Sequence, residues 1–200
     1  NQRMRKVASK YIIRNMIEKD IIEYGYSVTP NTRVGILGLH GKYEAKIISL
    51  VKALSVPGIN YFYFSTPLHL PSEWISEDAV PQLKEFLDQS RLIISLHGTK
   101  RQDFFVGGQQ YRTAQDICDV LRKTKWKVRR EVFMTRFNQD IIPELAGQHE
   151  DNLVNYHEHG GVQLEIPYGV RIDRDERKKF VDVMKKCLVR SEEINESDCT

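Results

Sequence analysis

Apolar residues along this chain form short runs that alternate with stretches of helical spacing. The runs have the length and composition of buried strands, and they lie at residues 34–40, 60–65, 91–97, 103–106, 127–134 and 161–166. Apolar residues spaced three or four positions apart predict helices at residues 44–55, 79–89, 112–123 and 174–190. Because strands alternate with helices, the pattern predicts an α/β protein with a three-layer α/β/α sandwich architecture.

The two ends of the chain fit the same single domain, residues 1–200. Helical spacing of apolar residues from about 3 to 25 predicts an N-terminal helix, within residues 1–30, that packs on the core. Residues 191–200 are polar and acidic, so we expect a loose tail there. No apolar stretch has the length of a membrane span and no signal peptide is visible, so we expect no membrane contact. The sequence leaves the compartment undetermined.

Two of the predicted strands end in the same dipeptide, His-Gly. The first run is Gly-Ile-Leu-Gly-Leu-His-Gly and ends with His40, and the second is Leu-Ile-Ile-Ser-Leu-His-Gly and contains His97. In α/β sheets, ligands and catalytic groups lie just past the carboxyl ends of the strands. We therefore expect His40 and His97 to lie at one place and to act as metal ligands.

Glu44 follows His40 by four residues and is expected in the first turn of the helix at 44–55. A histidine at a strand end and a carboxylate one turn later can face the same point, and His97 completes a His₂Glu set. That set with an open fourth position is the composition of catalytic zinc, although imidazole and carboxylate also bind other divalent ions. The alternative for Glu44 is an acid favoured by the helix dipole.

A third predicted strand, residues 161–166, carries one carboxylate among apolar neighbours. This residue is Glu165, and burial would raise its pKa toward the range in which it takes a proton from water. Glu165 is therefore the candidate general base, and its alternative is a structural pair with a core arginine. Arg171, six residues later, is the candidate for binding an anionic substrate group or stabilising an oxyanion.

Charge and cysteine content add little to this picture. The net charge is +3, and residues 123–130 hold five of the cations, which could steer a polyanion toward a nearby cleft. The alternatives are a solvated helix end with an edge strand, or a nucleic-acid surface, which would leave the paired His-Gly strands unexplained. The three cysteines have no metal-type spacing and imply neither a disulfide framework nor a zinc knuckle.

The motifs, taken in order, resemble those of the phage-type poly-γ-glutamate hydrolases. The resemblance spans about residues 34–171 and rests on the following segments: His-Gly with Glu at 40–44, the block at 68–81, Ser-Leu-His-Gly at 95–98, Gly-Gly at 107–108, and Gly-Val-Gln-Leu-Glu at 161–165 with Arg171. That family is related to the zinc carboxypeptidases and resembles the N-formylglutamate amidohydrolases. The resemblance implies an open mixed sheet between helices.

The resemblance also implies roles for individual residues. His40, Glu44 and His97 would be the ligands of one zinc ion, and Glu165 the base that activates water. Arg171 matches the arginine that follows the Gln-Leu-Glu strand. In this chain the spacing from His40 to Glu44 is one residue shorter than in the family's first motif.

From these residues we expect a zinc-dependent amidohydrolase that cleaves γ-glutamyl amide bonds in an anionic glutamate-type polymer. Two alternatives with related chemistry are an N-acyl amino acid amidase, which takes a small acyl-amino acid, and a carboxypeptidase-like peptidase. A third alternative, left open by the shortened spacing, is a non-catalytic binding module of the same fold with a degenerate metal site.

Overall fold

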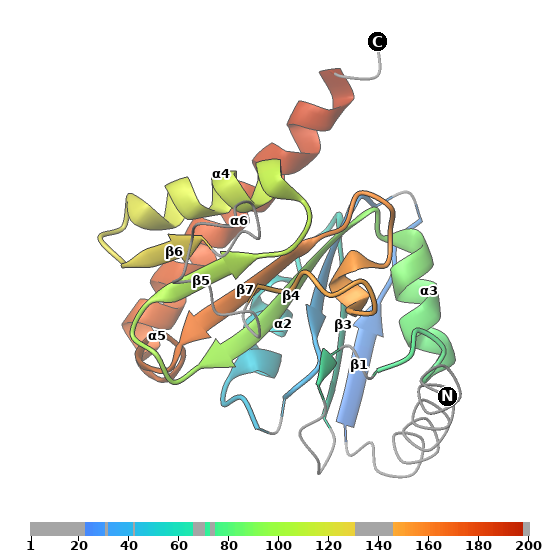
Figure 1. The fold of residues 1–200 in the computed structure, drawn as a ribbon, viewed down its shortest axis with the longest axis horizontal. Coiled ribbons are helices and arrows are strands. Elements are labelled where there is room, and N and C mark those ends of the chain that lie inside the picture. Colours follow the sequence, from blue (N-terminus) through green and yellow to red (C-terminus); the bar gives the residue numbers. More distant parts are fainter. Residues whose placement is uncertain are drawn as a thin grey trace.

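The computed structural model describes residues 23–30, 32–41, 43–65, 71–72, 75–130 and 146–197, and only the backbone of residues 189–197. Its centre is a seven-stranded sheet with the order β1-β3-β2-β4-β7-β5-β6 (Figure 1). The strands are β1 (Glu23–Ser27), β2 (Val34–Gly38), β3 (Ile59–Ser65), β4 (Leu92–Thr99), β5 (Phe104–Gly107), β6 (Val128–Arg130) and β7 (Val162–Pro167). Strands β2 and β3 are parallel neighbours, so the chain between them crosses over through a helix.

The sheet is mixed, and its parallel centre determines where the site forms. Strands β3, β2, β4 and β7 run parallel, whereas β1 pairs with β3 and β5 pairs with β7 in the antiparallel sense. In the β4–β7 pair, His97 lies opposite Glu165. Side chains at paired positions of neighbouring strands project from the same face of a sheet. The register therefore places these two candidate residues side by side.

Helices cover both faces of the sheet. They are α2 (Ile47–Leu54), α3 (Pro81–Gln89), α4 (Tyr111–Arg122), α5 (Tyr168–Ile172) and α6 (Arg174–Ser197), with a short 3-10 helix, η3 (Leu153–Asn155). One apolar cluster joins α2, α4 and α6 to the sheet, and a second joins α3 and η3 to its other face. In Figure 1, α2 and α6 lie behind the sheet and η3 lies in front. The predicted three-layer α/β/α arrangement is confirmed.

Burial explains why these segments form the elements that they do. All five residues of β2 and all six of β7 are buried, as expected for central strands covered on both faces. Helix α4 buries one stripe of residues, Ala114, Ile117, Cys118 and Leu121, which are spaced three and four apart. Pro81 begins α3, because proline at the first helical position removes no intrahelical hydrogen bond.

Two expectations from the sequence need correction. The N-terminal helix, expected to about residue 25, does not extend that far: residues 23–27 form β1, and the rest of the expected helix, up to residue 22, lies outside the described residues. The expected loose tail is helical as far as Ser197, because α6 continues from its packed first turns at the small cost of elongating an existing helix. The strand expected at 127–134 is confirmed at 128–130, as β6, and residues 131–134 lie outside the described residues.

Candidate metal centre and active site

A tight turn after β2 brings His40 and Glu44 together. His40 lies two residues beyond the end of β2, and its carbonyl oxygen accepts hydrogen bonds from the backbone N–H groups of Tyr43 (3.1 Å) and Glu44 (2.9 Å). The chain therefore turns back on itself before α2 begins at Ile47. The sequence placed Glu44 in the first turn of this helix, but Glu44 lies three residues before the helix begins. The alternative in which the helix dipole favours this acid is therefore not supported.

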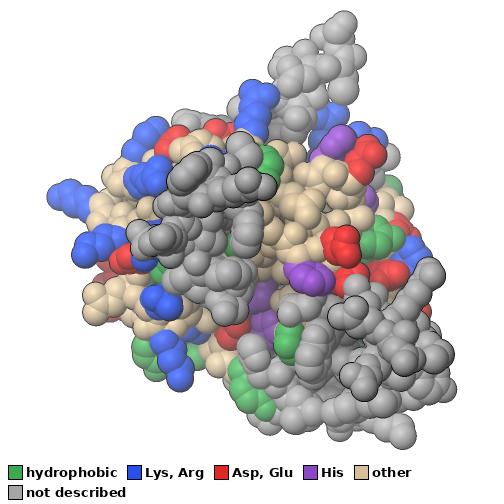
Figure 2. Space-filling model, in the orientation of Figure 1, with side chains coloured by type: hydrophobic (Ala, Val, Ile, Leu, Met, Phe, Trp, Pro, Cys, Tyr) green, Lys and Arg blue, Asp and Glu red, His purple; other side chains and the backbone are tan. Residues whose placement is uncertain are grey.

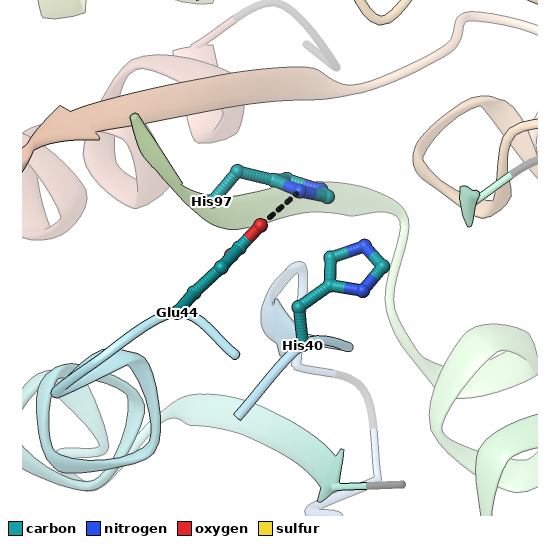
Figure 3. A group of neighbouring side chains, drawn as sticks. All are labelled: His40, Glu44 and His97. Atoms are coloured by element: carbon teal, nitrogen blue, oxygen red, sulfur yellow. Dashed lines mark ion pairs between the residues drawn. The ribbon is translucent and has the colours of Figure 1, made fainter. Parts of the chain in front are cut away.

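Three buried side chains form the candidate metal centre (Figure 3). His40, Glu44 and His97 offer ligand atoms that all lie within 4.8 Å of one another, and the three residues are 5%, 8% and 5% exposed. The Nδ1 atom of His97 lies 3.7 Å from Oε1 of Glu44, and the two imidazole rings lie 4.9 Å apart between centroids. Within the described residues, no other group of three or more histidine, cysteine or acidic side chains has this proximity.

Serine hydroxyls and a backbone amide hold these three side chains in place. Nε2 of His40 lies 3.2 Å from Oγ of Ser72, and Nε2 of His97 lies 3.0 Å from Oγ of Ser95. The backbone N–H of Gly98 donates to Oε2 of Glu44 over 2.9 Å. Outer partners of this kind orient imidazole and carboxylate ligands toward a metal ion. Two imidazoles and one carboxylate, buried and convergent, fit the donor set of a zinc ion with an open position.

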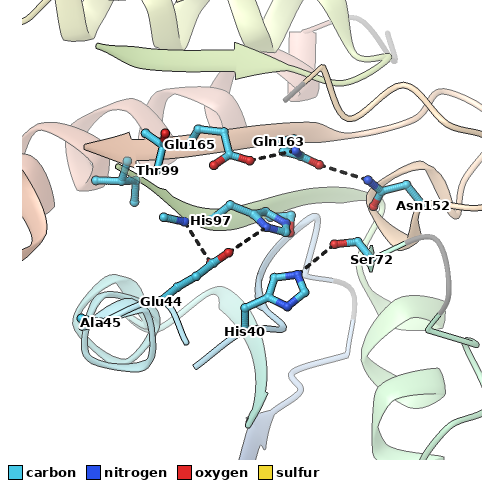
Figure 4. Close-up of polar contacts among 12 residues, drawn as sticks. His40, Glu44, Ala45, Ser72, His97, Thr99, Asn152, Gln163 and Glu165 are labelled. Carbon is cyan, nitrogen blue, oxygen red and sulfur yellow. Dashed lines mark hydrogen bonds and ion pairs between the residues drawn. The ribbon is translucent and has the colours of Figure 1, made fainter. Parts of the chain in front are cut away.

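Glu165 projects from β7 beside this group (Figure 4). The residue is 5% exposed, and burial raises the pKa of its carboxyl above the ordinary value, although the nearby His97 opposes that rise. Its Oε1 accepts a hydrogen bond from Nε2 of Gln163 over 3.0 Å. A carboxylate with a raised pKa, next to a group of metal-ligand side chains, has the properties of a general base.

Arg171 has partners that the sequence did not suggest. Its guanidinium donates to three backbone carbonyl oxygens: Nε to Ile166 (3.0 Å), Nη1 to Ala45 (2.7 Å) and Nη2 to Thr99 (3.3 Å). These carbonyls belong to β7, to the turn that follows Glu44, and to the end of β4. Arg171 is 3% exposed. Its guanidinium thus links the segments that carry the candidate base, Glu165, and two of the candidate ligands, Glu44 and His97.

The sequence analysis gave no role to several residues that support the site, although three of them lie in the motifs that it quotes. Ser95 and Gln163 lie two positions before His97 and Glu165 on their strands, so the two-residue period of a strand places them on the same face, and this signal could have identified them. Ser72 and Asn152 come from segments between the strands, and nothing in the local sequence pattern marks their contacts with His40 and Gln163.

Charged side chains are unevenly distributed over the face drawn in Figure 2. Lysine and arginine side chains gather on the side of β5, β6 and α4, whereas acidic side chains and histidines gather on the side of η3 and α3. Residues 123–130, which hold five cations, follow the end of α4 and lead into β6. No helix in the described part of the chain is both long enough and apolar enough to cross a membrane.

An α/β sheet that presents a buried His/Glu/His group beside a desolvated carboxylate is the arrangement of a metal-dependent hydrolase. Residues 14–187 match the profile of the family described as Poly-gamma-glutamate hydrolase. The chain belongs to this family, and the resemblance seen in its motifs is confirmed.

Solved structures show the same fold. A bacteriophage poly-γ-glutamate hydrolase aligns with a TM-score of 0.68 at 19% identity, over 86% of this chain and 90% of its own. A protein named YNDL, in an apo form described as zinc-free, gives the same TM-score and identity over 84% of this chain and 90% of its own. The gene product Atu2144 of Agrobacterium tumefaciens aligns with a TM-score of 0.57 at 9% identity, over 85% and 93%. No curated protein matches the sequence significantly.

Proposed function

We propose that this protein is a zinc-dependent amidohydrolase that cleaves the γ-glutamyl amide bonds of poly-γ-glutamate. The observation that carries the proposal is the convergence of His40, Glu44 and His97 within 4.8 Å, with Glu165 in register beside His97. Membership of the poly-γ-glutamate hydrolase family supports the substrate class. The shortened spacing between His40 and Glu44 does not separate the two side chains, because the turn at His40 brings them together.

His40, Glu44 and His97 would hold the zinc ion. The chemistry that this ion supplies when bound is Lewis acidity, which polarises an amide carbonyl and acidifies water. Ser72 and Ser95 hold the two imidazoles in a fixed orientation through Nε2. The Gly98 amide holds the Glu44 carboxylate through a hydrogen bond to Oε2.

Glu165 acts as the proton carrier. Its carboxylate takes a proton from the attacking water and gives the same proton to the amine nitrogen that leaves when the amide bond breaks. A raised pKa suits both halves of this task, because the carboxyl group must gain the proton and hold it until the nitrogen accepts it. Glu44 and Glu165 thus have different environments and different roles, ligand and base.

We assign Arg171 a positioning role, because its guanidinium donates to three backbone carbonyls around the site. It holds together the segments that carry Glu44, His97 and Glu165. The expectation that Arg171 binds a substrate carboxylate stays a prediction, and the variants described in the Discussion separate the two roles.

An anionic polymer also suits the charge distribution of the surface. Poly-γ-glutamate carries one carboxylate on each residue, and the cationic side of the molecule at β5, β6 and α4 would attract it. Strand β5 pairs with β7, which carries Glu165, so this cationic side adjoins the strand of the candidate base. Attraction of this kind weakens as salt screens the charges.

The experiment that tests the proposal compares four proteins: the wild type, Glu165→Gln, His97→Ala, and Glu158→Gln as a control at an exposed acid. Cleavage of poly-γ-glutamate is followed by the release of amino groups, and zinc content by elemental mass spectrometry. We expect turnover and one zinc per chain in the wild type and the control, zinc without turnover in Glu165→Gln, and neither in His97→Ala. Normal turnover by Glu165→Gln would refute the assignment of the base.

Alternative substrates are separated by a panel at equal concentration. Poly-γ-glutamate, N-formylglutamate and peptides with free or blocked carboxyl ends distinguish a polymer hydrolase from an N-acyl amino acid amidase and a carboxypeptidase-like peptidase. If the wild type binds poly-γ-glutamate but hydrolyses none of these compounds with zinc present, the chain is a binding module with a degenerate site.

A further inference from the structure

Three buried side chains form a hydrogen-bonded row that ends at the candidate base (Figure 4). Nδ2 of Asn152 lies 3.0 Å from Oε1 of Gln163, and Nε2 of Gln163 lies 3.0 Å from Oε1 of Glu165. The three residues are 6%, 3% and 5% exposed, so water has little access to these contacts. The row therefore connects η3, which begins after Asn152, to the carboxylate of Glu165.

The backbone determines the direction in which this row donates. The N–H of Val154 donates to Oδ1 of Asn152 over 3.1 Å, and a backbone N–H can only donate. The Asn152 oxygen must therefore face Val154, which leaves its nitrogen to face Gln163. The Gln163 oxygen accepts from that nitrogen, so its own nitrogen faces Glu165. One backbone amide at the start of η3 thus sets the orientation of both carboxamides.

Tight packing holds Gln163 in this orientation. Gly147 lies against it so closely that a Cβ atom there would lie 2.5 Å from Cβ of Gln163, and Gly147 has a φ of 60°. Nδ2 of Asn155 donates to the carbonyl oxygen of Gly147 over 2.8 Å, which holds Gly147 against Gln163. On the neighbouring strand, β5, Gln163 faces Gly107, which has no side chain. The Gln163 side chain is therefore closely packed on these sides.

We propose that Asn152 and Gln163 are positioning residues that hold Glu165 for proton transfer; this inference rests on the proposed role of Glu165 as the base. The Gln163 amide donates a hydrogen bond to Oε1 of Glu165, so we infer that Oε2 of Glu165 takes and gives the proton. The donated hydrogen bond also prevents the carboxylate from rotating about its terminal torsion, which is otherwise broad. Asn152 acts indirectly, because its hydrogen bond to Gln163 determines whether the nitrogen or the oxygen of the Gln163 amide faces the Glu165 carboxylate.

A single substitution can reverse the direction of hydrogen-bond donation along the row without changing the size of the side chains. In Asn152→Asp, one carboxylate oxygen still accepts from Val154, because aspartate caps a helix as well as asparagine does. The other oxygen cannot donate to Gln163, so the Gln163 amide rotates and turns its own oxygen toward Glu165. Gln163→Glu has the same consequence from the middle of the row, since Asn152 still donates to it while an oxygen meets Glu165.

The experiment measures steady-state kinetics on poly-γ-glutamate for the wild type and both variants, with zinc content and thermal unfolding as checks. Gln89→Glu, at an exposed position on α3, adds the same charge outside the row and serves as the control. We expect kcat to fall about 10-fold to 100-fold in Asn152→Asp and Gln163→Glu, as is usual for residues that orient a functional group. KM and zinc content should stay close to those of the wild type, whereas the unfolding midpoint should fall, because each variant buries an additional carboxylate.

A second readout does not depend on activity. The side-chain amide of Gln163 in the wild type should exchange its protons with deuterium far more slowly than the exposed amide of Gln89, measured by ¹⁵N NMR. Its signal is assigned by its absence in Gln163→Glu, and in Asn152→Asp it should shift as the amide changes partner. The exchange rate is measured on the wild type and does not require turnover, and Gln163→Asn supplies the assignment if Gln163→Glu does not fold.

Two results would overturn the inference. One is a kcat within twofold of the wild type in the folded variants, and the other is an exposed-like exchange rate for the Gln163 amide in the wild type. A wild-type protein that does not hydrolyse poly-γ-glutamate would instead refute the proposed function. The exchange measurement would then still report whether the row exists.

Discussion

Replacing Arg171 by lysine tests how the site is held together. The arginine makes three hydrogen bonds to backbone carbonyls of Ile166, Ala45 and Thr99, which belong to three separate segments around the site. Lysine keeps the positive charge near Glu44 and Glu165 but presents a single ammonium on a flexible stem, without the planar fork of donors. It can reach one of these carbonyls well, so about two of the hydrogen bonds are lost.

The expected loss of stability follows from that count. A hydrogen bond to a charged group contributes about 1.5–3 kcal/mol, and a buried carbonyl left without a partner adds its own desolvation cost. Two lost bonds correspond to about 3–5 kcal/mol, after allowance for a water molecule that enters and replaces part of the loss. This is a large fraction of the ordinary free energy of unfolding, about 5–15 kcal/mol.

The assay is urea unfolding of Arg171→Lys followed by circular dichroism, compared with the wild type and with Arg174→Lys, an exposed control on α6. The control should stay within about 0.5 kcal/mol of the wild type. If Arg171 instead bound a substrate carboxylate, the variant would keep its stability and show a raised KM. A stability within 1 kcal/mol of the wild type would refute the positioning role.

Three further predictions concern single residues. Gly98→Ala should cost about 1–3 kcal/mol, measured by the same unfolding assay, because a Cβ atom there would lie 2.5 Å from Cζ of Arg171; an unchanged midpoint would contradict this. Burial raises the pKa of the Cys118 thiol to about 11, so at pH 8 it should resist alkylation in the native protein and react in urea, as read by peptide mass spectrometry; rapid native labelling would be the contrary result. A hydrogen bond from Lys84 lowers the pKa of Asp88, so Asp88 stabilises the fold above its unfolded pKa, near 3.8, and loses that effect as the pH falls through its lower folded value. The unfolding midpoint of Asp88→Asn should therefore lie below that of the wild type at pH 6 and converge with it as the pH falls below 3.8, and a gap that widens toward acid would have the wrong sign.

The central strands could be predicted because their environment is simple. Strands β2, β4 and β7 are buried on both faces, and a strand buried in this way requires a nearly continuous apolar run. Strand β1 carries exposed or half-exposed residues along its whole length, so its sequence lacks such a run. Its place in the sheet comes from pairing with β3, which periodicity within a segment does not reveal.

The candidate ligands could be predicted because histidine and glutamate are rare at buried strand ends and stand out there. The contacts of Arg171 could not, because its partners are backbone carbonyls, which every residue possesses. The row from Asn152 to Glu165 could not be predicted either. Its members come together only when the segment before β7 folds back over the sheet, and no local sequence pattern indicates this contact.

The position of β7 has a consequence for the order in which the molecule assembles. It is the last strand along the chain, yet it lies between β4 and β5 in the sheet. Before residues 162–167 are synthesised, β4 and β5 have no common partner, and each presents an unpaired edge that invites association with other chains. The candidate metal ligands all lie before residue 100 and belong to the earlier half of the sheet, whereas Glu165 arrives with the final strand. A nascent chain would therefore acquire the means to bind an ion before it acquires the means to use it.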